Sequence, residues 1–143
     1  MPVLTIDGQT VEVEKGKTLL DAAKALNIEI PTLCHHWAVP EAGACRICVV
    51  EIKSGGRPGL VPACSYPAED GLVIETRSDR VIQSRRMTLT LMINRAPQAG
   101  IIMEMAEEYQ VPQMKLKAHP HSTSDSHTQE DITEPCDTDL CIM

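Results

Sequence analysis

The sequence predicts an α+β domain, followed by a helical extension and a flexible acidic tail. Strand-like alternation precedes and follows one helical pattern within the first 78 residues. Residues 1–96 carry eleven basic and eleven acidic side chains, whereas residues 97–143 carry two basic and nine acidic ones. We therefore expect three parts, with boundaries at residues 1–78, 79–112 and 113–143.

The first two strands are predicted at residues 3–6 and 9–13, where apolar and polar side chains alternate. Between them stands Asp7-Gly8, a residue pair that favours a two-residue hairpin turn. This segment lacks the basic start and the apolar stretch of a signal peptide. We expect a β-hairpin at the beginning of the chain.

A helix is predicted to follow this hairpin. Thr18 can cap its first turn, and Asp21 places a carboxylate where the helix amides favour one. Apolar residues then share one face, and Asn27 can end the helix in a left-handed conformation. The residues on this face are Leu19, Leu20, Ala23 and Leu26.

Further strands are predicted at residues 47–52, 60–64 and 72–76. Gly-rich and Pro-containing turns at residues 54–59 and 68–71 separate them. Two strands, one helix that crosses them and strands that return give the element order of a β-grasp sheet.

The predicted extension is helical. A second helix is expected to begin at Ser78 or Asp79 and to run to about Asn94, before a third short helix at residues 101–109. We expect an apolar stripe on each helix and a basic opposite face on the second. The stripes are Ile82, Leu89, Met92 and Ile93, and then Ile101, Met105 and Tyr109; the basic face is Arg80, Arg85 and Arg86.

Composition excludes several classes of function. The neutral body and acidic tail argue against nucleic acid as a partner, because phosphate binding requires a basic surface. No apolar stretch is long enough to span a membrane. We expect a cytoplasmic protein, and in that reducing compartment clustered cysteines favour metal ligands over disulfides.

Four of the six cysteines lie between positions 34 and 64, with the spacing C-x10-C-x2-C-x15-C. These residues, Cys34, Cys45, Cys48 and Cys64, supply the four thiolates that an iron–sulfur cluster usually needs. Gly43 and Ala44 allow the backbone to pass close to the bridging sulfides, and Arg46 adds a nearby positive charge. The pattern favours one [2Fe-2S] cluster.

Other sites remain open at this point. Four cysteines can bind zinc in a closed structural site, although zinc ribbons usually pair two C-x2-C knuckles. His35 and His36 beside Cys34 allow a mixed ligand set, as in Rieske centres. Four available cysteines favour ordinary loop histidines instead.

The four cysteines and the residues around them also resemble a known group of proteins. The resemblance extends over roughly residues 1–95 and rests on the runs P-T-L-C, G-A-C-R-I-C-V-V-E-I and V-P-A-C, and on the helix starts T-L-L-D-A-A and S-D-R-V-I-Q-S-R-R. They resemble the N-terminal [2Fe-2S] ferredoxin-like domain of a group of redox proteins. That group comprises the complex I large iron–sulfur subunit, the diaphorase small subunit of NAD-linked hydrogenases, iron-only hydrogenases and NAD-dependent formate dehydrogenases. The first gap, ten residues, differs from the four of plant-type ferredoxins.

The resemblance implies that Cys34, Cys45, Cys48 and Cys64 are the cluster ligands and that no residue is a catalytic acid, base or nucleophile. It implies one-electron transfer as part of an NAD(P)H-linked oxidoreductase of the formate dehydrogenase or hydrogenase type. The expected partners are a flavin subunit that oxidises NADH and a catalytic oxidoreductase subunit. A free ferredoxin-like shuttle and a structural zinc or scaffold domain are the alternatives.

Two features depart from the family pattern. Many relatives bind a four-iron cluster after the arginine-rich helix, but residues 94–109 contain no Cys or His, so we expect that cluster to be absent. The final run, E-P-C-D-T-D-L-C-I-M, resembles the start of a bacterial-type two-cluster ferredoxin module. We therefore expect either the first piece of a longer polypeptide or a short relative. Cys136 and Cys141 are expected to be exposed tail residues, with an adventitious site involving His119, His121 and His127 as the alternative.

Overall fold

Strands and helices follow one another in the predicted order along the chain. A computed structural model describes residues 1–36, 38–40 and 42–112. Its elements are β1 (Val3–Ile6), β2 (Gln9–Glu12), α1 (Leu19–Ala25), β3 (Val49–Ser54), β4 (Gly59–Pro62), β5 (Val73–Glu75), α2 (Asp79–Arg95) and α3 (Gly100–Glu108). One compact unit comprises Met1–Thr88, and a second begins at Leu89. The predicted tail, with Cys136 and Cys141, lies outside the described residues.

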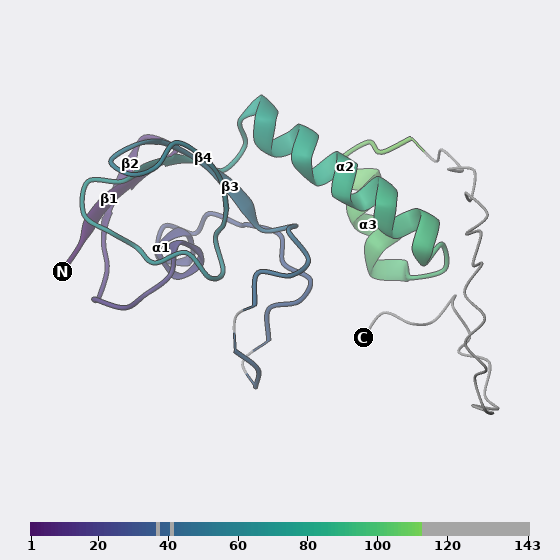
Figure 1. Ribbon diagram of the computed structural model, residues 1–143, viewed down its shortest axis with the longest axis horizontal. Helices are drawn as coiled ribbons and strands as arrows, with labels where there is room; N and C mark the ends of the chain where they lie inside the picture. Colours follow the sequence, from purple (N-terminus) through teal and green to yellow (C-terminus); the bar gives the residue numbers. More distant parts are fainter. Residues whose placement is uncertain (37, 41, 113–143) are drawn as a thin grey trace, which may run out of the picture. The chain divides into compact units, whose positions relative to one another are not determined.

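The sheet of the first unit has five strands in the order β2-β1-β5-β3-β4. β1 pairs with β2 antiparallel and with β5 parallel, and β3 pairs antiparallel with both β4 and β5. Helix α1 lies against one face of this sheet (Figure 1). This mixed sheet with a crossing helix confirms the predicted α+β class.

The core of this unit lies between α1 and the sheet. Leu20 and Ala23 of α1 pack in one cluster with Ile6, Val50 and Ile74 from three strands. All five side chains are at most 2% exposed. Small aliphatic side chains therefore form the core of a chain that contains no Phe.

The predicted turn between β1 and β2 is confirmed by its backbone. Asp7 has φ +48° and Gly8 has φ +81°, as a type I′ hairpin turn requires. The Asp7 carboxylate also accepts hydrogen bonds from the backbone N–H and the hydroxyl of Thr76, at 2.8 and 2.6 Å. The turn thereby holds the chain just beyond β5.

Both predicted ends of α1 are confirmed. Thr18 Oγ1 accepts from the Asp21 N–H at 3.3 Å, and the Asp21 carboxylate accepts from the Thr18 N–H at 3.2 Å, which completes a capping box. At the other end Asn27 is left-handed, with φ +56°. Ile28 N–H donates to the Ala23 carbonyl at 2.9 Å, as in a Schellman motif.

The loop between β3 and β4 packs tightly against the turn before β5. Gly55 has φ +80°, and a Cβ atom there would collide with the backbone carbonyl of Gly71. β3 also carries an irregular register with β5 between Ile52 and Ser54. Only a glycine at position 55 allows the two loops to approach this closely.

Helix α2 begins as predicted, and Leu89 and Ile93 of its predicted apolar stripe are buried, whereas Ile82 and Met92 are only partly buried. Ser78 Oγ accepts a hydrogen bond from the Val81 N–H at 3.3 Å and caps the first turn. Arg85, which we placed on the basic opposite face, is only 1% exposed. The buried positions of α2 are Val81, Arg85, Leu89 and Ile93, four residues apart. The prediction for Arg85 was therefore wrong.

The predicted stripe of α3 is also displaced by one position. Ile102 and Ala106 are buried, whereas Ile101 is 52% exposed. The helix begins at Gly100 and its last turn is followed by Gln110 with φ +52°. Among the described residues, no helix combines the length and the apolar character needed to cross a bilayer.

Candidate metal centre

Strand pairing brings two of the four predicted cysteine ligands together. Cys48 immediately precedes β3, and Cys64 lies two residues after β4. These strands are antiparallel, and the Ala63 N–H donates to the Cys48 carbonyl at 3.1 Å. Both cysteine side chains are buried, at 1% exposure.

The other two cysteines come from the loop between α1 and β3. Cys34 is exposed and Cys45 is half-buried. The Cys34 side chain is hydrogen-bonded to the Cys45 sulfur. Cys64 is hydrogen-bonded to Cys48 and also interacts electrostatically with Cys34. The thiols therefore lie in two neighbouring pairs, Cys34 with Cys45 and Cys48 with Cys64.

Backbone amides surround the Cys45 sulfur. Partial burial opposes ionisation, but backbone hydrogen bonds from Ile47, Cys34 and Leu33, together with the Cys34 side chain, lower the pKa of the Cys45 thiol. Such N–H groups stabilise a thiolate, which is the form that binds a metal.

The pKa of the Cys64 thiol is shifted in the opposite direction. Burial raises its pKa to about 12, and the neighbouring Cys48 and Cys34 sulfurs add to the rise, while a backbone hydrogen bond from Gly43 opposes it. Two thiolates this close repel each other without a cation between them. A positive charge at this place would therefore favour loss of the Cys64 proton at neutral pH.

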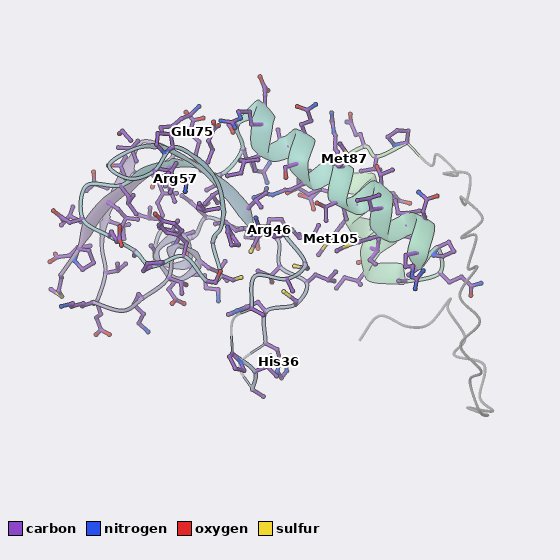
Figure 2. The ribbon with its side chains drawn as sticks, in the orientation of Figure 1. His36, Arg46, Arg57, Glu75, Met87 and Met105 are labelled. Carbon is purple, nitrogen blue, oxygen red and sulfur yellow. The ribbon has the colours of Figure 1, made fainter. Side chains whose placement is uncertain are left out.

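The backbone beside these sulfurs has little free space. Gly43 is buried with φ +60°, and a Cβ atom there would lie 2.9 Å from Ser65 Oγ and 3.2 Å from Pro62 Cγ. Arg46 is also left-handed, with φ +59°, and its side chain is exposed, as is Ala44. Figure 2 shows Arg46 near the base of the loop that carries His36.

These residues fit a two-iron cluster better than a single metal ion. Across residues 1–36, 38–40 and 42–112, no three Cys, His, Asp or Glu side chains are close enough together to hold one ion. Two adjacent pairs of thiols can instead offer two ligands to each of two irons. The backbone N–H groups that reach the Cys45 and Cys64 sulfurs are donors of the kind that stabilise negatively charged cluster sulfurs.

His35 and His36, beside Cys34, are the other possible ligands of a mixed set. His36 Nδ1 accepts a hydrogen bond from the Ala38 N–H at 3.2 Å. His35 Nδ1 is buried and has no hydrogen-bond partner among the described residues. The four cysteines remain the better candidates, because they already supply the four thiolates that such a cluster usually needs.

The sequence prediction missed one residue of this region. The Arg85 guanidinium donates from Nε to the Ile47 carbonyl at 3.1 Å and from Nη2 to the Val49 carbonyl at 2.8 Å. These two carbonyls flank Cys48. A sequence signal for it existed, because Arg85 lies four residues after Val81 and four before Leu89, within the buried stripe.

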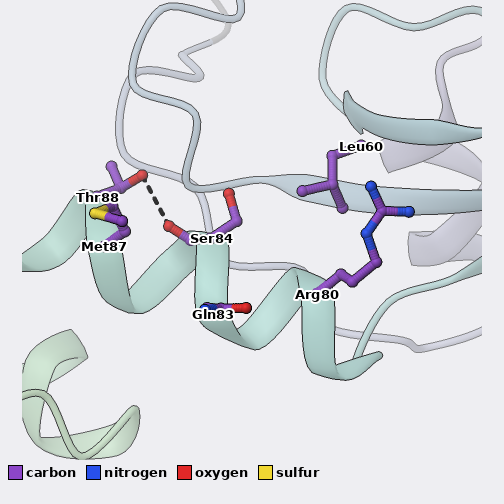
Figure 3. A pocket seen from close by; sticks show the side chains of 6 residues that line it. All are labelled: Leu60, Arg80, Gln83, Ser84, Met87 and Thr88. Atoms are coloured by element: carbon purple, nitrogen blue, oxygen red, sulfur yellow. Dashed lines mark hydrogen bonds between the residues drawn. The ribbon is translucent and has the colours of Figure 1, made fainter.

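A shallow groove of about 320 Å³ lies between β4 and the first half of α2 (Figure 3). Met87 is its most exposed apolar side chain, at 63%. Its lining contains no Cys, His, Asp or Glu and offers neither metal ligands nor a general acid or base. It consists of Leu60, Arg80, Gln83, Ser84, Met87 and Thr88.

Known proteins are similar to this chain in sequence, and a solved structure is similar to it in fold. Subunit HndD of the NADP-reducing hydrogenase of Solidesulfovibrio fructosivorans is 36% identical over 155 residues, which cover 100% of this chain and 26% of that protein. One component of the NADH-quinone oxidoreductase of Rhizobium meliloti is 37% identical over 117 residues, or 82% of this chain and 14% of that protein. The chain therefore spans about a quarter or less of these relatives.

A solved structure agrees with these relatives. The crystal structure of an NAD+-reducing [NiFe]-hydrogenase in the H2-reduced state superposes with a TM-score of 0.67 and 26% identity, and covers 78% of this chain and 50% of that one. Residues 3–79 match the family described as a 2Fe-2S iron-sulfur cluster binding domain. This match confirms the predicted [2Fe-2S] cofactor and disfavours the zinc alternative. The chain belongs to the family of 2Fe-2S iron–sulfur cluster binding domains.

Proposed function

We propose that this chain transfers single electrons within an NAD(P)H-linked oxidoreductase, through one [2Fe-2S] cluster held by Cys34, Cys45, Cys48 and Cys64. The observation that carries the proposal is the match of residues 3–79 to the 2Fe-2S family, and the pairing of β3 with β4, which brings Cys48 and Cys64 together, supports it. When bound, the cluster supplies reversible one-electron oxidation and reduction. The chain itself supplies ligands, amide donors and a closely packed surrounding.

Each pair of cysteines contributes differently to this site. Cys48 and Cys64 are buried at the ends of paired strands, so the sheet fixes their separation. Cys34 is exposed and Cys45 half-buried, so their side of the site is closer to solvent. We propose that the Cys48 and Cys64 pair binds one iron, and that the Cys34 and Cys45 pair binds the other.

The partners proposed are other parts of an oxidoreductase. The relatives described above are named as subunits of an NADP-reducing hydrogenase and of an NADH-quinone oxidoreductase. We propose a flavin subunit that oxidises NAD(P)H as one neighbour and a catalytic subunit of the hydrogenase or formate dehydrogenase type as the other. A cytoplasmic location belongs to this proposal, because ligand cysteines must stay reduced.

Spectroscopy of anaerobically purified protein tests the cofactor and its ligands. We expect visible absorption, and an EPR signal of one unpaired electron after reduction with dithionite. Cys45→Ser and Cys48→Ser should each lose most of this absorption, because a hydroxyl is a poor substitute for a thiolate on iron. Cys141→Ser, the control outside the described residues, should retain it.

Two results would contradict the proposal. A colourless protein with stoichiometric zinc and no EPR signal after dithionite would exclude electron transfer. Equal absorption loss in Cys45→Ser and Cys141→Ser would show that the ligands are misassigned. Size-exclusion chromatography of the native protein tests the partners: elution as a free monomer would favour a ferredoxin-like shuttle.

A further inference from the structure

Arg85 is a charged side chain in a place where charged side chains are rare. It is 1% exposed, although arginines are almost never fully buried without compensating contacts. Its guanidinium donates to the carbonyls of Ile47 and Val49, at 3.1 and 2.8 Å. Because Ile47, Cys48 and Val49 are consecutive, one planar group contacts the backbone on both sides of Cys48.

The sheet explains why a side chain is needed there. The register of β5 against β3 ends where Glu75 pairs with Glu51, so no residue of β5 lies opposite Val49. On the other side, the Ala63 N–H of the chain after β4 donates to the Cys48 carbonyl, so the carbonyl of the next residue, Val49, points away from β4. Val49 is buried, and without Arg85 its carbonyl would lack a strand partner. Arg85 continues the hydrogen bonding of the sheet up to the cysteine loop.

The position of this cation also has an electrostatic consequence. Reduction adds one negative charge to a cluster, and a nearby positive charge stabilises that state. A buried charge is screened far less than a charge in solvent. Net charge and hydrogen bonding around the sulfurs are the protein's main means of setting the potential.

We propose that Arg85 is a positioning residue of the cluster site, which fixes the backbone on both sides of Cys48 and raises the reduction potential through its buried positive charge. This inference rests on the proposed ligand set. It makes separate predictions for geometry and for charge, because substitutions of Arg85 can remove one and retain the other.

The test measures the midpoint potential by EPR-monitored redox titration, and the rate of cluster loss to an iron chelator. Arg85→Met and Arg85→Gln remove the charge. In both we expect about a tenfold lower ratio of reduced to oxidised cluster at a fixed potential, which is about 59 mV more negative for one electron. Arg85→Lys keeps the charge without the planar fork, so we expect a potential close to wild type but faster cluster loss.

Arg86→Met is the matched control. Arg86 is the next residue of α2 and is exposed, so its charge is screened by solvent. Its removal should leave both the potential and the rate of cluster loss close to wild type. A shift equal to that of Arg85→Met would mean that the overall charge of the protein, rather than Arg85, sets the potential.

The outcomes separate this inference from the proposed function. Wild-type potential in Arg85→Met or Arg85→Gln overturns the electrostatic role, and wild-type cluster loss in Arg85→Lys overturns the positioning role. If neither Arg85→Met nor Arg85→Gln retains a cluster, the potential of Arg85→Lys tests the electrostatic role. Because lysine keeps the positive charge, a shifted potential in this variant would contradict that role. If Cys48→Ser keeps its cluster, the ligand assignment itself fails. If it loses the cluster while all Arg85 variants match wild type, only this inference fails.

Discussion

Glu51 on β3 and Glu75 on β5 lie directly opposite each other in the sheet, and Lys53 Nζ lies 3.2 Å from a carboxylate oxygen of each. Two like charges in this arrangement destabilise a sheet unless a cation lies between them. Arg80 from the first turns of α2 adds a second contact, 2.8 Å from Glu51. The network joins the start of α2 to the sheet.

Glu51→Gln should destabilise the protein because Glu51 is 4% exposed and central to the network. A hydrogen bond from Ser78 lowers its pKa; burial opposes this shift, and Lys53 and Arg80 reinforce it. We expect a loss of about 1–3 kcal/mol in the free energy of unfolding at pH 7. Because the pKa of Glu51 is lower in the folded protein than in the unfolded chain, its ionised carboxylate stabilises the fold at pH values above the pKa of the unfolded chain. This stabilisation is lost as the pH falls. The difference between wild type and variant should therefore shrink below pH 4.5.

Urea unfolding of the cluster-free proteins at pH 7 and pH 4 provides the measurement. Glu75→Gln is the matched control, since its side chain is 45% exposed. An exposed ion pair contributes about 0.2–1 kcal/mol, so this variant should lose less. Equal losses in the two variants would contradict the central role of Glu51.

Thr18→Ala should destabilise α1 by about 1 kcal/mol, because the capping box loses its hydroxyl. Thr18→Ser keeps an oxygen that can accept from the Asp21 N–H and should lose much less. Thermal unfolding measured by circular dichroism compares the two. An alanine variant as stable as the serine variant would show that the cap contributes nothing.

Gly43→Ala should impair cluster binding. The new Cβ atom would crowd Ser65 and Pro62, and φ +60° costs an alanine about 1–2 kcal/mol. Gly16→Ala is the control, because Gly16 also has positive φ, at +92°, but a Cβ atom there meets nothing within 4 Å. Iron content and visible absorption should fall only in Gly43→Ala. Equal loss in both would indicate general destabilisation.

The cluster-free protein should lose stability in alkaline solution through Cys64. Burial, together with the adjacent Cys48 and Cys34, raises the Cys64 pKa from 9.0 to about 12. A thiol with a raised pKa in the fold favours folding below pH 9.0, and this contribution disappears as pH rises towards 12. Cys64→Ser should show a shallower loss of unfolding free energy over this range. Identical slopes in the two proteins would contradict the raised pKa.

Local elements of this fold were predictable because their signals lie within a few residues. Asp7-Gly8 turns the hairpin, Thr18 and Asp21 cap α1, and Ser78 caps α2. Each signal depends on contacts between near neighbours in sequence. The strand order was not predictable in this way, because the pairing of β1 with β5 joins residues about 70 positions apart.

The candidate site was predictable in its chemistry but not in its geometry. The spacing of the cysteines identified the cofactor, which the family match confirms. Which thiols form pairs depends on the pairing of β3 with β4. The position of Arg85 was predicted wrongly because its charge suggested a side chain that faces solvent. Inside the fold, β5 ends before it reaches Val49, and Arg85 donates a hydrogen bond to the Val49 carbonyl instead.

The close contact at Gly55 has a genetic consequence. A side chain at Gly55 would collide with the main chain of Gly71, and no substitution at another position removes main-chain atoms. At Gly43 the nearest obstacle is the hydroxyl of Ser65, so Ser65→Ala relieves part of the conflict. A search for second-site suppressors should therefore recover revertants of Gly43→Ala at a neighbouring position, while Gly55→Ala should be rescued only by restoration of the glycine.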